Sequence, residues 1–350
     1  MTAQLIAVYG AYGHTGRLVA AELLARGRDI VLAGRDTGAL ERAAAELGAP
    51  GRVTVRTAPV EDPDALRRLA AEAGVLVHCA GPFSVTGAPV AAAAAESGCP
   101  YVDHALEPHH VKAVFDTQQA TAQRTGSVMI PGLSFYGGLG DLLAGAVADG
   151  LSAVDKLIVA YAVTGWRLTT GAKNTAAQLF AETQRITFTD GTLRVGQLEP
   201  VNVVFPFPPP LGPRTMLKPL PSFEPVTVPR HIPVRTVETL LTQSTFEEEK
   251  VFESEDLDPA SRARSAFTVA AQAITQHGGR VGTLSGHDLW RAGALASVEA
   301  AIRLTEGRGP SKTGVLSPAE AFQPTPFLHS LEEQGAFTMT LPQSPAGAES

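Results

Sequence analysis

Residues 5–35 read LIAVYGAYGHTGRLVAAELLARGRDIVLAGR, and this stretch decides the fold. Apolar residues 5–9 predict a strand, residues 16–26 a helix that ends at Gly27, and residues 30–33 a second strand. The loop between the first strand and the helix has glycines spaced G-x-x-G-x-x-G. Such a loop presents backbone N–H groups and a positive helix end to a phosphate. The stretch therefore predicts a Rossmann-type dinucleotide-binding fold.

The same alternation of strand and helix continues to residue 130. Further strands are expected at 53–57, 75–79, 101–102 and 128–130, with helices at 38–47, 62–73, 89–97 and 108–125 between or beside them. Strands separated by helices favour a parallel sheet with helices on its faces. The predicted fold class is thus α/β with a Rossmann-type parallel sheet.

The pattern changes after Pro131, which predicts a second, inserted α+β domain. Residues 199–233 are too rich in proline for regular helix, and Phe205 and Phe207 in that segment suggest a lid or a dimer contact. Strands are expected at 156–161 and 235–246, and helices at 171–184, 261–276 and 287–304. The expected domains are a dinucleotide-binding domain at 1–133, an inserted domain at 134–285, C-terminal helices at 286–340 and a tail at 341–350.

Composition excludes several classes of protein. The 350 residues carry 28 basic and 35 acidic side chains, a formal charge of −7, so a nucleic-acid partner is not expected. The N-terminus lacks the basic region of a signal peptide, and no apolar run reaches the length of a membrane helix. Two cysteines, both in apolar runs, do not make a disulfide framework. We expect a cytoplasmic protein without membrane insertion.

Two further loops extend the predicted cofactor site. Arg35 follows the second strand where an acidic residue would bind the ribose of NAD, and its guanidinium suits a 2′-phosphate, which favours NADPH. Neighbouring Asp36 is expected in a turn or at a helix cap. The turn after the fourth strand is expected beside the nicotinamide. The predicted cofactor-binding residues are Gly10, Ala11, Tyr12, Gly13, His14, Thr15, Gly16, Arg35, Ala80, Gly81, Pro82 and Phe83.

These loops, with several later motifs, resemble those of the saccharopine dehydrogenase-like oxidoreductases. The similar stretches are the glycine loop, Gly34-Arg35, the AGPF turn at 80–83, GCPYVD at 98–103 followed by Glu107, PG at 131–132, GHDLW at 286–290 and GVLSPAEAF at 314–322. The resemblance spans nearly the whole chain. It implies an NADP-dependent oxidoreductase whose C-terminal helices return to the dinucleotide-binding domain.

Four residues are candidates for chemistry on the substrate. His104 follows a strand at the carboxyl edge of the sheet and is a candidate proton donor, and Asp103 precedes it. Tyr136 lies in a glycine-rich stretch, and Lys173 near the start of a predicted helix. Glu107, His109 and His110 lie close by, but adjacent histidines on a helix point apart, so no metal site is expected.

The predicted function is NADPH-dependent hydride transfer to a small organic substrate, with a C=N bond as the reacting bond. Two alternatives stay open: an enoyl reductase acting on a lipid or polyketide C=C bond, and a non-catalytic NADPH-sensing or partner-binding protein. A greasy substrate would suit the phenylalanines at 205, 207 and 223. A homodimer is a further expectation.

Overall fold

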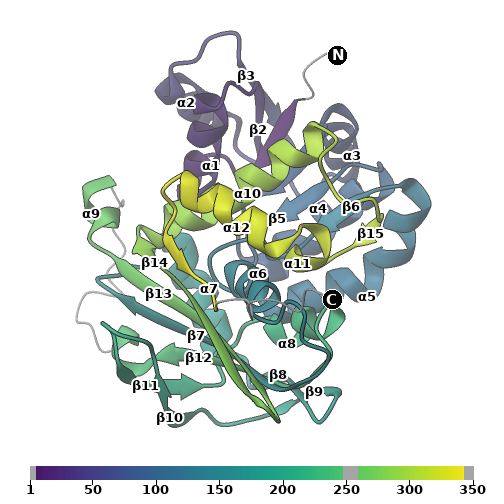
Figure 1. Cartoon of the computed structure of the whole chain (residues 1–350). Coiled ribbons are helices and arrows are strands. Elements are labelled where there is room, and N and C mark those ends of the chain that lie inside the picture. Colours follow the sequence, from purple (N-terminus) through teal and green to yellow (C-terminus); the bar gives the residue numbers. More distant parts are fainter. Residues whose placement is uncertain (1–4, 247–258, 343–350) are drawn as a thin grey trace, which may run out of the picture.

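The computed structural model describes residues 5–246 and 259–342, so most of the predicted tail at 341–350 lies outside the described residues. Figure 1 shows two sheets, one in each half of the molecule, with C-terminal helices running between them. Helix α10 (Leu289–Thr305) packs against α1 (His14–Ala25) of the first half, and α12 (Pro324–Glu333) packs against α6 (Gly138–Val147) of the second. In the described ranges no helix is long and apolar enough to cross a membrane.

The first sheet has seven parallel strands in the order β15-β6-β5-β4-β1-β2-β3. Its strands are β1 (Ile6–Tyr9), β2 (Ile30–Gly34), β3 (Val53–Thr57), β4 (Val75–His78), β5 (Tyr101–Asp103), β6 (Val128–Ile130) and β15 (Gly314–Val315). The central strands are buried on both faces, as their continuous apolar sequence predicts. The predicted α/β class is confirmed.

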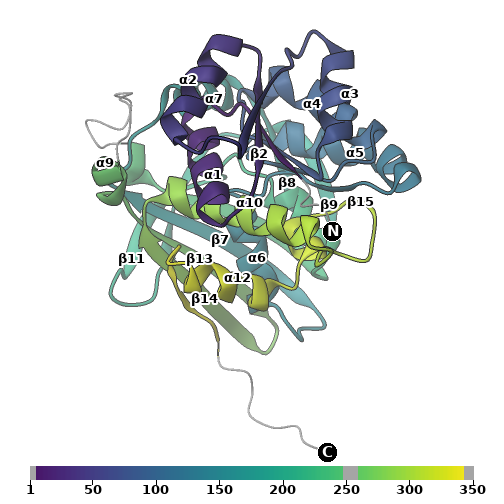
Figure 2. The same cartoon turned by 90° about the horizontal axis from the view of Figure 1, so that it is seen from above.

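Helices cover both faces of this sheet, as Figure 2 shows from above. Helices α1 and α10 cover one face, and α3 (Pro63–Glu72), α4 (Phe83–Glu96) and α5 (Pro108–Thr125) the other. Helix α2 (Thr37–Leu47) packs beside β2 and β3. Helix α4 begins at Phe83, six residues before the predicted start at Pro89, because the carboxylate of Glu107 accepts the Phe83 N–H at the new helix end.

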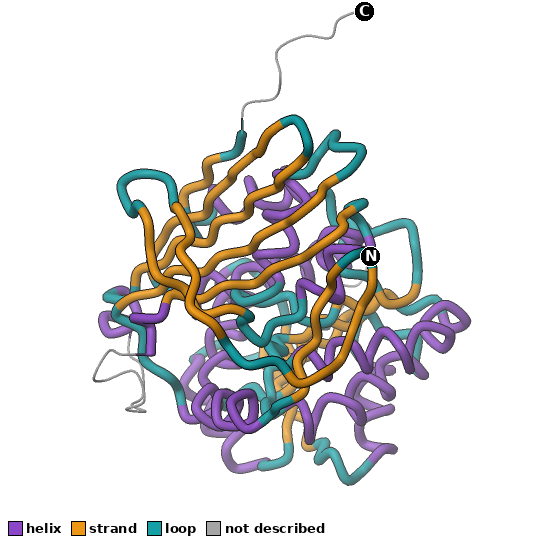
Figure 3. Tube along the Cα trace, turned by 90° about the horizontal axis from the view of Figure 1, so that it is seen from below, coloured by secondary structure: helices purple, strands orange, loops and turns teal. Residues whose placement is uncertain are grey.

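The second sheet is mixed and has nine strands. Its main path runs β10-β11-β12-β7-β13-β14-β16, with β8 and β9 paired beside β12. The strands are β7 (Val154–Thr164), β8 (Gln184–Thr189), β9 (Thr192–Gln197), β10 (Val201–Pro206), β11 (Pro213–Lys218), β12 (Val234–Thr242), β13 (Ala266–Thr275), β14 (Gly278–His287) and β16 (Thr338–Thr340). Figure 3 shows these strands from the side opposite the first domain, in front of the helices.

Two sequence predictions for this half were wrong. Residues 261–276 were expected as one helix, but only α9 (Pro259–Ala263) is helical there, and β13 follows. Strand β13 lies between β7 and β14, and buried and half-buried residues alternate along most of its length. Its alanine-rich sequence favours helix, and this hid the alternation. Phe205 and Phe207 do not form a lid, because both are buried against the sheet, beside Met216 and Leu240. The alternative for this segment, a dimer contact, stays a prediction.

The inserted half also supplies short helices that complete the space between the sheets. Helix α7 (Thr170–Ala181) follows β7 and lies over the carboxyl edge of the first sheet, while α8 (Glu224–Thr227) and a 3-10 turn at Val228–Arg230 precede β12. Another 3-10 turn, Gln243–Phe246, follows β12, and α11 (Pro318–Ala321) precedes α12. The two halves therefore meet along the edge where a dinucleotide binds in this fold.

Candidate active site

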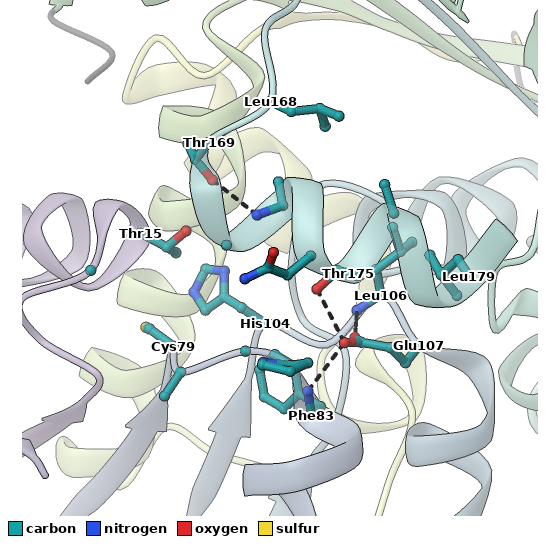
Figure 4. Close-up of a pocket in the computed structure, with 18 of the residues that line it drawn as sticks. Thr15, Cys79, Phe83, His104, Leu106, Glu107, Leu168, Thr169, Thr175 and Leu179 are labelled. Atoms are coloured by element: carbon teal, nitrogen blue, oxygen red, sulfur yellow. Dashed lines mark hydrogen bonds between the residues drawn. The ribbon is translucent and has the colours of Figure 1, made fainter. Parts of the chain in front are cut away.

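A cavity of about 660 Å³ runs along the carboxyl edge of the first sheet and is closed by the second domain. Its walls come from the loops after β1, β2, β4 and β5 on one side, and from α7 and the ends of β11 and β12 on the other. Figure 4 shows His104 and Cys79 at the strand ends, with α7 passing over them. An open α/β sheet binds its ligand at this place.

Each of the three glycines of the first loop is needed for a different structural reason. Gly10 has φ +80°, and a Cβ there would lie 2.7 Å from the Cβ of Ala80 in the turn after β4. A Cβ on Gly16 would overlap the carbonyl oxygen of Gly10, so α1 can approach the loop only with glycine at that position. A Cβ on Gly13 would meet only that same oxygen, at 3.2 Å. Gly13 lines the cavity, so this position is open toward a ligand.

The start of α1 fits a pyrophosphate. The helix begins at His14, and its N-cap, Gly13, offers no side chain to satisfy the first-turn N–H groups. The N–H of Gly13 itself donates to the carbonyl of Gly10 (3.0 Å), so the donors available to a ligand come from the first turn that follows. Thr15 lines the cavity at this helix end. The predicted phosphate loop thus has the required shape and polarity.

The end of β2 provides a place for a further phosphate. Arg35 is exposed at the rim of the cavity and forms no salt bridge with the described part of the chain. Asp36 is turned away from this role, because its carboxylate caps α2 by accepting the Ala39 N–H at 2.9 Å. An unpaired guanidinium without a competing carboxylate on the same turn suits the 2′-phosphate of NADP.

Glu107 joins three elements around the cavity. Its carboxylate accepts the N–H of Phe83 (3.1 Å), the N–H of Leu106 (3.0 Å) and the hydroxyl of Thr175 on α7 (3.3 Å). Figure 4 shows these contacts below α7. The sequence analysis placed Glu107 in a family motif and beside two histidines, but gave it no structural role. In the structure it fixes the loops after β4 and β5 to the second domain.

Asp103 lies behind the cavity wall and does not line it. Its carboxylate accepts the N–H groups of Gly132 (2.7 Å) and Ala105 (3.0 Å) and the hydroxyl of Tyr101 (2.9 Å), and it pairs with His110 (3.0 Å). Burial raises its pKa, but His110 and the two N–H groups outweigh that effect and hold the pKa at about 2. Asp103 therefore organises the loops, and the structure does not bring it together with the other chemical candidates.

His104 does line the cavity, at the end of β5. Its Nε2 lies 2.7 Å from the hydroxyl of Ser297 on α10. Burial lowers the pKa of His104 to about 4, so the ring is neutral near pH 7. It can pass on a hydrogen bond, but it does not store a proton as an imidazolium at that pH.

Of the two remaining candidates, Tyr136 lines the cavity and Lys173 does not. Tyr136 lines the cavity with a hydroxyl that is buried and has no hydrogen-bond partner within the described chain. Lys173 is exposed on α7 and is not in the cavity wall, where its neighbours Ala172, Asn174 and Thr175 lie instead. Neighbouring residues of an α-helix point in different directions, so Lys173 faces away from the cavity that Ala172 and Asn174 line.

Sequence reasoning missed both tryptophans of the chain. Trp166 follows β7, Trp290 begins α10, and both line the cavity. Their rings lie 6.3 Å apart, Trp290 lies 5.4 Å from the His14 ring, and Trp166 lies 6.0 Å from the Tyr136 ring. An aromatic wall therefore runs from the phosphate loop to the second domain. The GHDLW motif at 286–290 contains Trp290, but no role was predicted for it. No local sequence pattern indicated a role for Trp166.

Cys79 is the remaining reactive side chain of the wall. Burial raises its pKa well above the ordinary value for a thiol, so it stays protonated and is a poor nucleophile. No group of three potential metal ligands is present among residues 5–246 and 259–342. The arrangement of the wall is that of a site for a bound redox cofactor.

A parallel sheet, a glycine loop before a helix and a cavity at the carboxyl edge define a dinucleotide-binding protein of Rossmann type. Within that class, residues 6–130 match the model of the saccharopine dehydrogenase NADP binding domain. The predicted family resemblance and the predicted cofactor, NADP(H), are thereby confirmed. The residues present fit that cofactor at the phosphate loop and at Arg35.

Similar proteins are oxidoreductases. A probable mitochondrial saccharopine dehydrogenase-like oxidoreductase of Arabidopsis thaliana is 35% identical over 140 residues, which cover 37% of this chain and 31% of that protein. A putative trans-acting enoyl reductase of Mycobacterium tuberculosis is 34% identical over 133 residues, covering 37% and 32%. The matches thus span about a third of these relatives' own length.

The whole fold has a counterpart among solved structures. Saccharopine dehydrogenase (L-Glu forming) from Saccharomyces cerevisiae superposes with a TM-score of 0.64 over 97% of this chain and 100% of that chain, at 12% identity. At this identity the likeness concerns the fold alone. It extends the similarity beyond the cofactor domain to the second sheet and the C-terminal helices.

Proposed function

We propose that the protein is an NADPH-dependent reductase that transfers a hydride to an apolar substrate, at a C=C bond conjugated to a carbonyl group. Bound NADPH supplies the hydride. The observation that carries the proposal is the apolar lining of the cavity on the side of the second domain. Its apolar members are Trp166, Leu168, Ala172, Ala176, Leu179, Pro200, Leu217, Pro219, Leu220, Pro221 and Leu241. They outnumber the polar residues of the same side, which are Thr169, Thr170, Asn174, Thr175 and Arg185.

The apolar lining comes from residues far apart in the sequence, and these differ from the three phenylalanines that were expected to favour an apolar substrate. Phe205, Phe207 and Phe223 are buried in the protein core and do not line the cavity. Leucines and prolines from α7, β11 and β12 take their place. An apolar wall of this extent favours a substrate that buries hydrocarbon on binding.

Only two of the four polar residues predicted to act on the substrate line the cavity. The sequence predicted a C=N bond as the reacting bond and four polar candidates for chemistry, Asp103, His104, Tyr136 and Lys173. Only His104 and Tyr136 line the cavity. One observation still favours a C=N bond as a second candidate: the buried carboxylate of Glu107 lies in the wall and would stabilise a positive iminium. Its three hydrogen bonds from the protein already compensate much of its charge.

The protein's own residues have separate tasks in this proposal. The first turn of α1 would hold the pyrophosphate of the cofactor, and Arg35 its 2′-phosphate. Glu107 fixes the turn at 80–83 against α7, which keeps the cofactor cavity closed to water on that side. His104, neutral and anchored by Ser297, orders the hydrogen bonds around the reacting atoms.

Turnover of two substrate panels tests the proposal. One panel contains α,β-unsaturated thioesters and ketones of increasing chain length, and the other contains amine and carbonyl pairs that form imines. We expect NADPH consumption with the first panel. The value of kcat/KM should rise about fourfold for each added methylene until the cavity is filled, because each buried methylene contributes about 0.8 kcal/mol.

The other outcomes separate the alternatives. Turnover confined to the imine panel would move the assignment to the C=N bond and to Glu107. Tight NADPH binding with no turnover in either panel would favour the sensing or partner-binding alternative.

A further inference from the structure

We infer that Tyr136 and Trp166 form a subsite for one carbonyl oxygen of the substrate. This inference rests on the proposed function and deepens it. Tyr136 belongs to the loop before α6 and Trp166 to the segment after β7, so two separate parts of the second half build the subsite. Both side chains line the cavity, and each is only 8% exposed.

The two side chains share one unusual property. The hydroxyl of Tyr136 and the indole Nε1 of Trp166 are buried, and neither has a hydrogen-bond partner in the described chain. A buried polar group without a partner costs about 1–3 kcal/mol. In native structures such groups commonly pair with a water, an ion or a ligand. At a cavity wall, a ligand can fill that place. The ring centroids lie 6.0 Å apart, so both groups belong to the same end of the cavity.

Tyr161 shows that this lack of a partner is specific to Tyr136. The rings of Tyr136 and Tyr161 are neighbours, with centroids 5.0 Å apart. The hydroxyl of Tyr161 nevertheless donates to Glu224 at 2.7 Å and accepts the N–H of Gly137 at 2.8 Å. One hydroxyl is therefore fully used in holding the fold, whereas the other belongs to a side chain that lines the cavity and has no partner in the described chain.

The chemistry of the two groups identifies their ligand. An indole N–H can only donate, and burial raises the pKa of the Tyr136 phenol, which keeps it protonated and able to donate. Two donors in an apolar wall suit an acceptor oxygen, whereas a cationic iminium nitrogen has no lone pair to offer them. The subsite therefore selects carbonyl compounds over imines.

The same two donors act when charge develops. In the proposed reaction a hydride adds to the β-carbon, and the C=C electron pair moves toward the carbonyl oxygen, where Tyr136 and Trp166 donate their hydrogen bonds. A proton from water then adds to the α-carbon. The overall change consumes NADPH and one proton and yields NADP⁺ and the saturated carbonyl compound.

Infrared spectroscopy of a bound probe tests the subsite without turnover. The probe is 4-phenyl-3-buten-2-one with a ¹³C-labelled carbonyl, bound to the protein loaded with NADP⁺, which cannot donate a hydride. We expect the carbonyl band at lower wavenumber than in hexane. Tyr136→Phe and Trp166→Phe should each restore part of the shift and weaken probe binding about two- to tenfold, and the double variant should restore all of it.

Trp290→Phe is the matched control, because Trp290 is the other tryptophan of the same wall and its Nε1 is not among the unpartnered buried atoms. The carbonyl band should stay shifted in this variant. An unshifted band in the wild-type protein, or a shift that both Tyr136→Phe and Trp166→Phe retain in full, overturns the subsite. Turnover of the unsaturated panel is measured separately, so the proposed reaction can stand when the subsite fails.

Thermal unfolding of the protein without ligands gives a second readout. Tyr136→Phe should unfold at the same temperature as the wild type or a higher one, because it removes a buried polar group that lacks a partner. Tyr161→Phe should unfold at a lower temperature, because it leaves Glu224 and the N–H of Gly137 without their partner. Equal destabilisation by both variants would assign Tyr136 to the fold and overturn its role in binding.

Discussion

At the scale of single residues, the pairing state of a charged or polar group separates structure from function in this protein. Asp36 and Arg35 are neighbours, yet the carboxylate of Asp36 caps a helix while the guanidinium of Arg35 has no salt bridge within the described ranges. Asp103 and Glu107 are both buried acids, and both are saturated by protein donors. Groups that the fold already uses are poor candidates for ligand binding, which leaves Arg35 as the charged group best placed for a phosphate.

Replacement of Arg35 tests this assignment. Arg35→Ala should weaken NADPH binding about ten- to a hundredfold, because a charge-assisted contact is worth about 1.5–3 kcal/mol. Binding of NADH should change little, since NADH lacks the 2′-phosphate. Both affinities can be measured by quenching of the two tryptophans, which lie in the cavity wall. Equal losses for the two cofactors would contradict the assignment.

At the scale of elements, the passage from β1 to α1 combines packing and binding in seven residues. Gly10 and Gly16 are required by packing, because side chains there would meet Ala80 and the Gly10 carbonyl. Gly13 differs, since its φ of −74° is open to any residue and the space beside it belongs to the cavity. The same motif therefore contains two glycines that the packing of the fold requires, Gly10 and Gly16, and one that leaves space for the ligand, Gly13.

Valine substitutions separate these roles. Gly13→Val should keep the wild-type thermal unfolding temperature within a few degrees but lose NADPH binding, because the side chain fills the approach of the pyrophosphate. Gly16→Val should lower the unfolding temperature strongly or prevent folding, because α1 must move away from the loop. Circular dichroism and tryptophan quenching on both variants check this. Wild-type NADPH affinity in folded Gly13→Val would argue against the phosphate loop.

The elements also show what could be predicted from the sequence. The first domain followed from local pattern, because glycine loops and alternating strands and helices are encoded by neighbouring residues. Strand β13 could not be predicted, because its conformation depends on pairing with β7 and β14 at both edges. Trp166 was missed for the same reason: its role depends on Tyr136 and Trp290, which are distant in the chain.

At the scale of the whole molecule, the C-terminal segment connects the two sheets. Strand β15 pairs with β6 in the first sheet, and β16 pairs with β14 in the second. Arg26 of the first domain pairs with Glu299 on α10 (3.1 Å), and Glu22 pairs with Arg291 (3.1 Å). Ser297 on the same helix holds His104. The interdomain cavity and the stability of the molecule thus both depend on contacts of α10.

Two buried histidines of the first domain predict a loss of stability in acid. Burial lowers the pKa of His78 to about 3 and that of His104 to about 4, whereas in the unfolded chain a histidine has a pKa near 6.5. Below pH 6.5 these two histidines therefore bind protons in the unfolded chain but stay neutral in the folded protein until their lowered pKa values are reached. Each of the two histidines should lower the free energy of unfolding by about 1.4 kcal/mol per pH unit until its folded pKa is reached.

Other histidines do not cancel this slope. His110 and His231 are paired with Asp103 and Asp141, and burial lowers their pKa values less than these carboxylates raise them. Their stabilising effect is fully present below pH 6.5 and is lost as the pH rises through their raised pKa values. Between pH 6 and pH 5 they are largely protonated in both states, so they do not offset the slope that His78 and His104 give in that window.

Urea unfolding at pH 7, 6 and 5 measures this slope. His104→Gln should lower the acid slope between pH 6 and pH 5 by about 1.4 kcal/mol per pH unit, because the glutamine cannot take up a proton in the unfolded chain. His277→Gln, which changes an exposed histidine in the turn between β13 and β14, is the control and should leave the curve parallel to that of the wild type. An unchanged slope in His104→Gln would mean that the ring takes up a proton in the folded protein. The ring would then be open to solvent, and the neutral role proposed for His104 at the reacting atoms would be wrong.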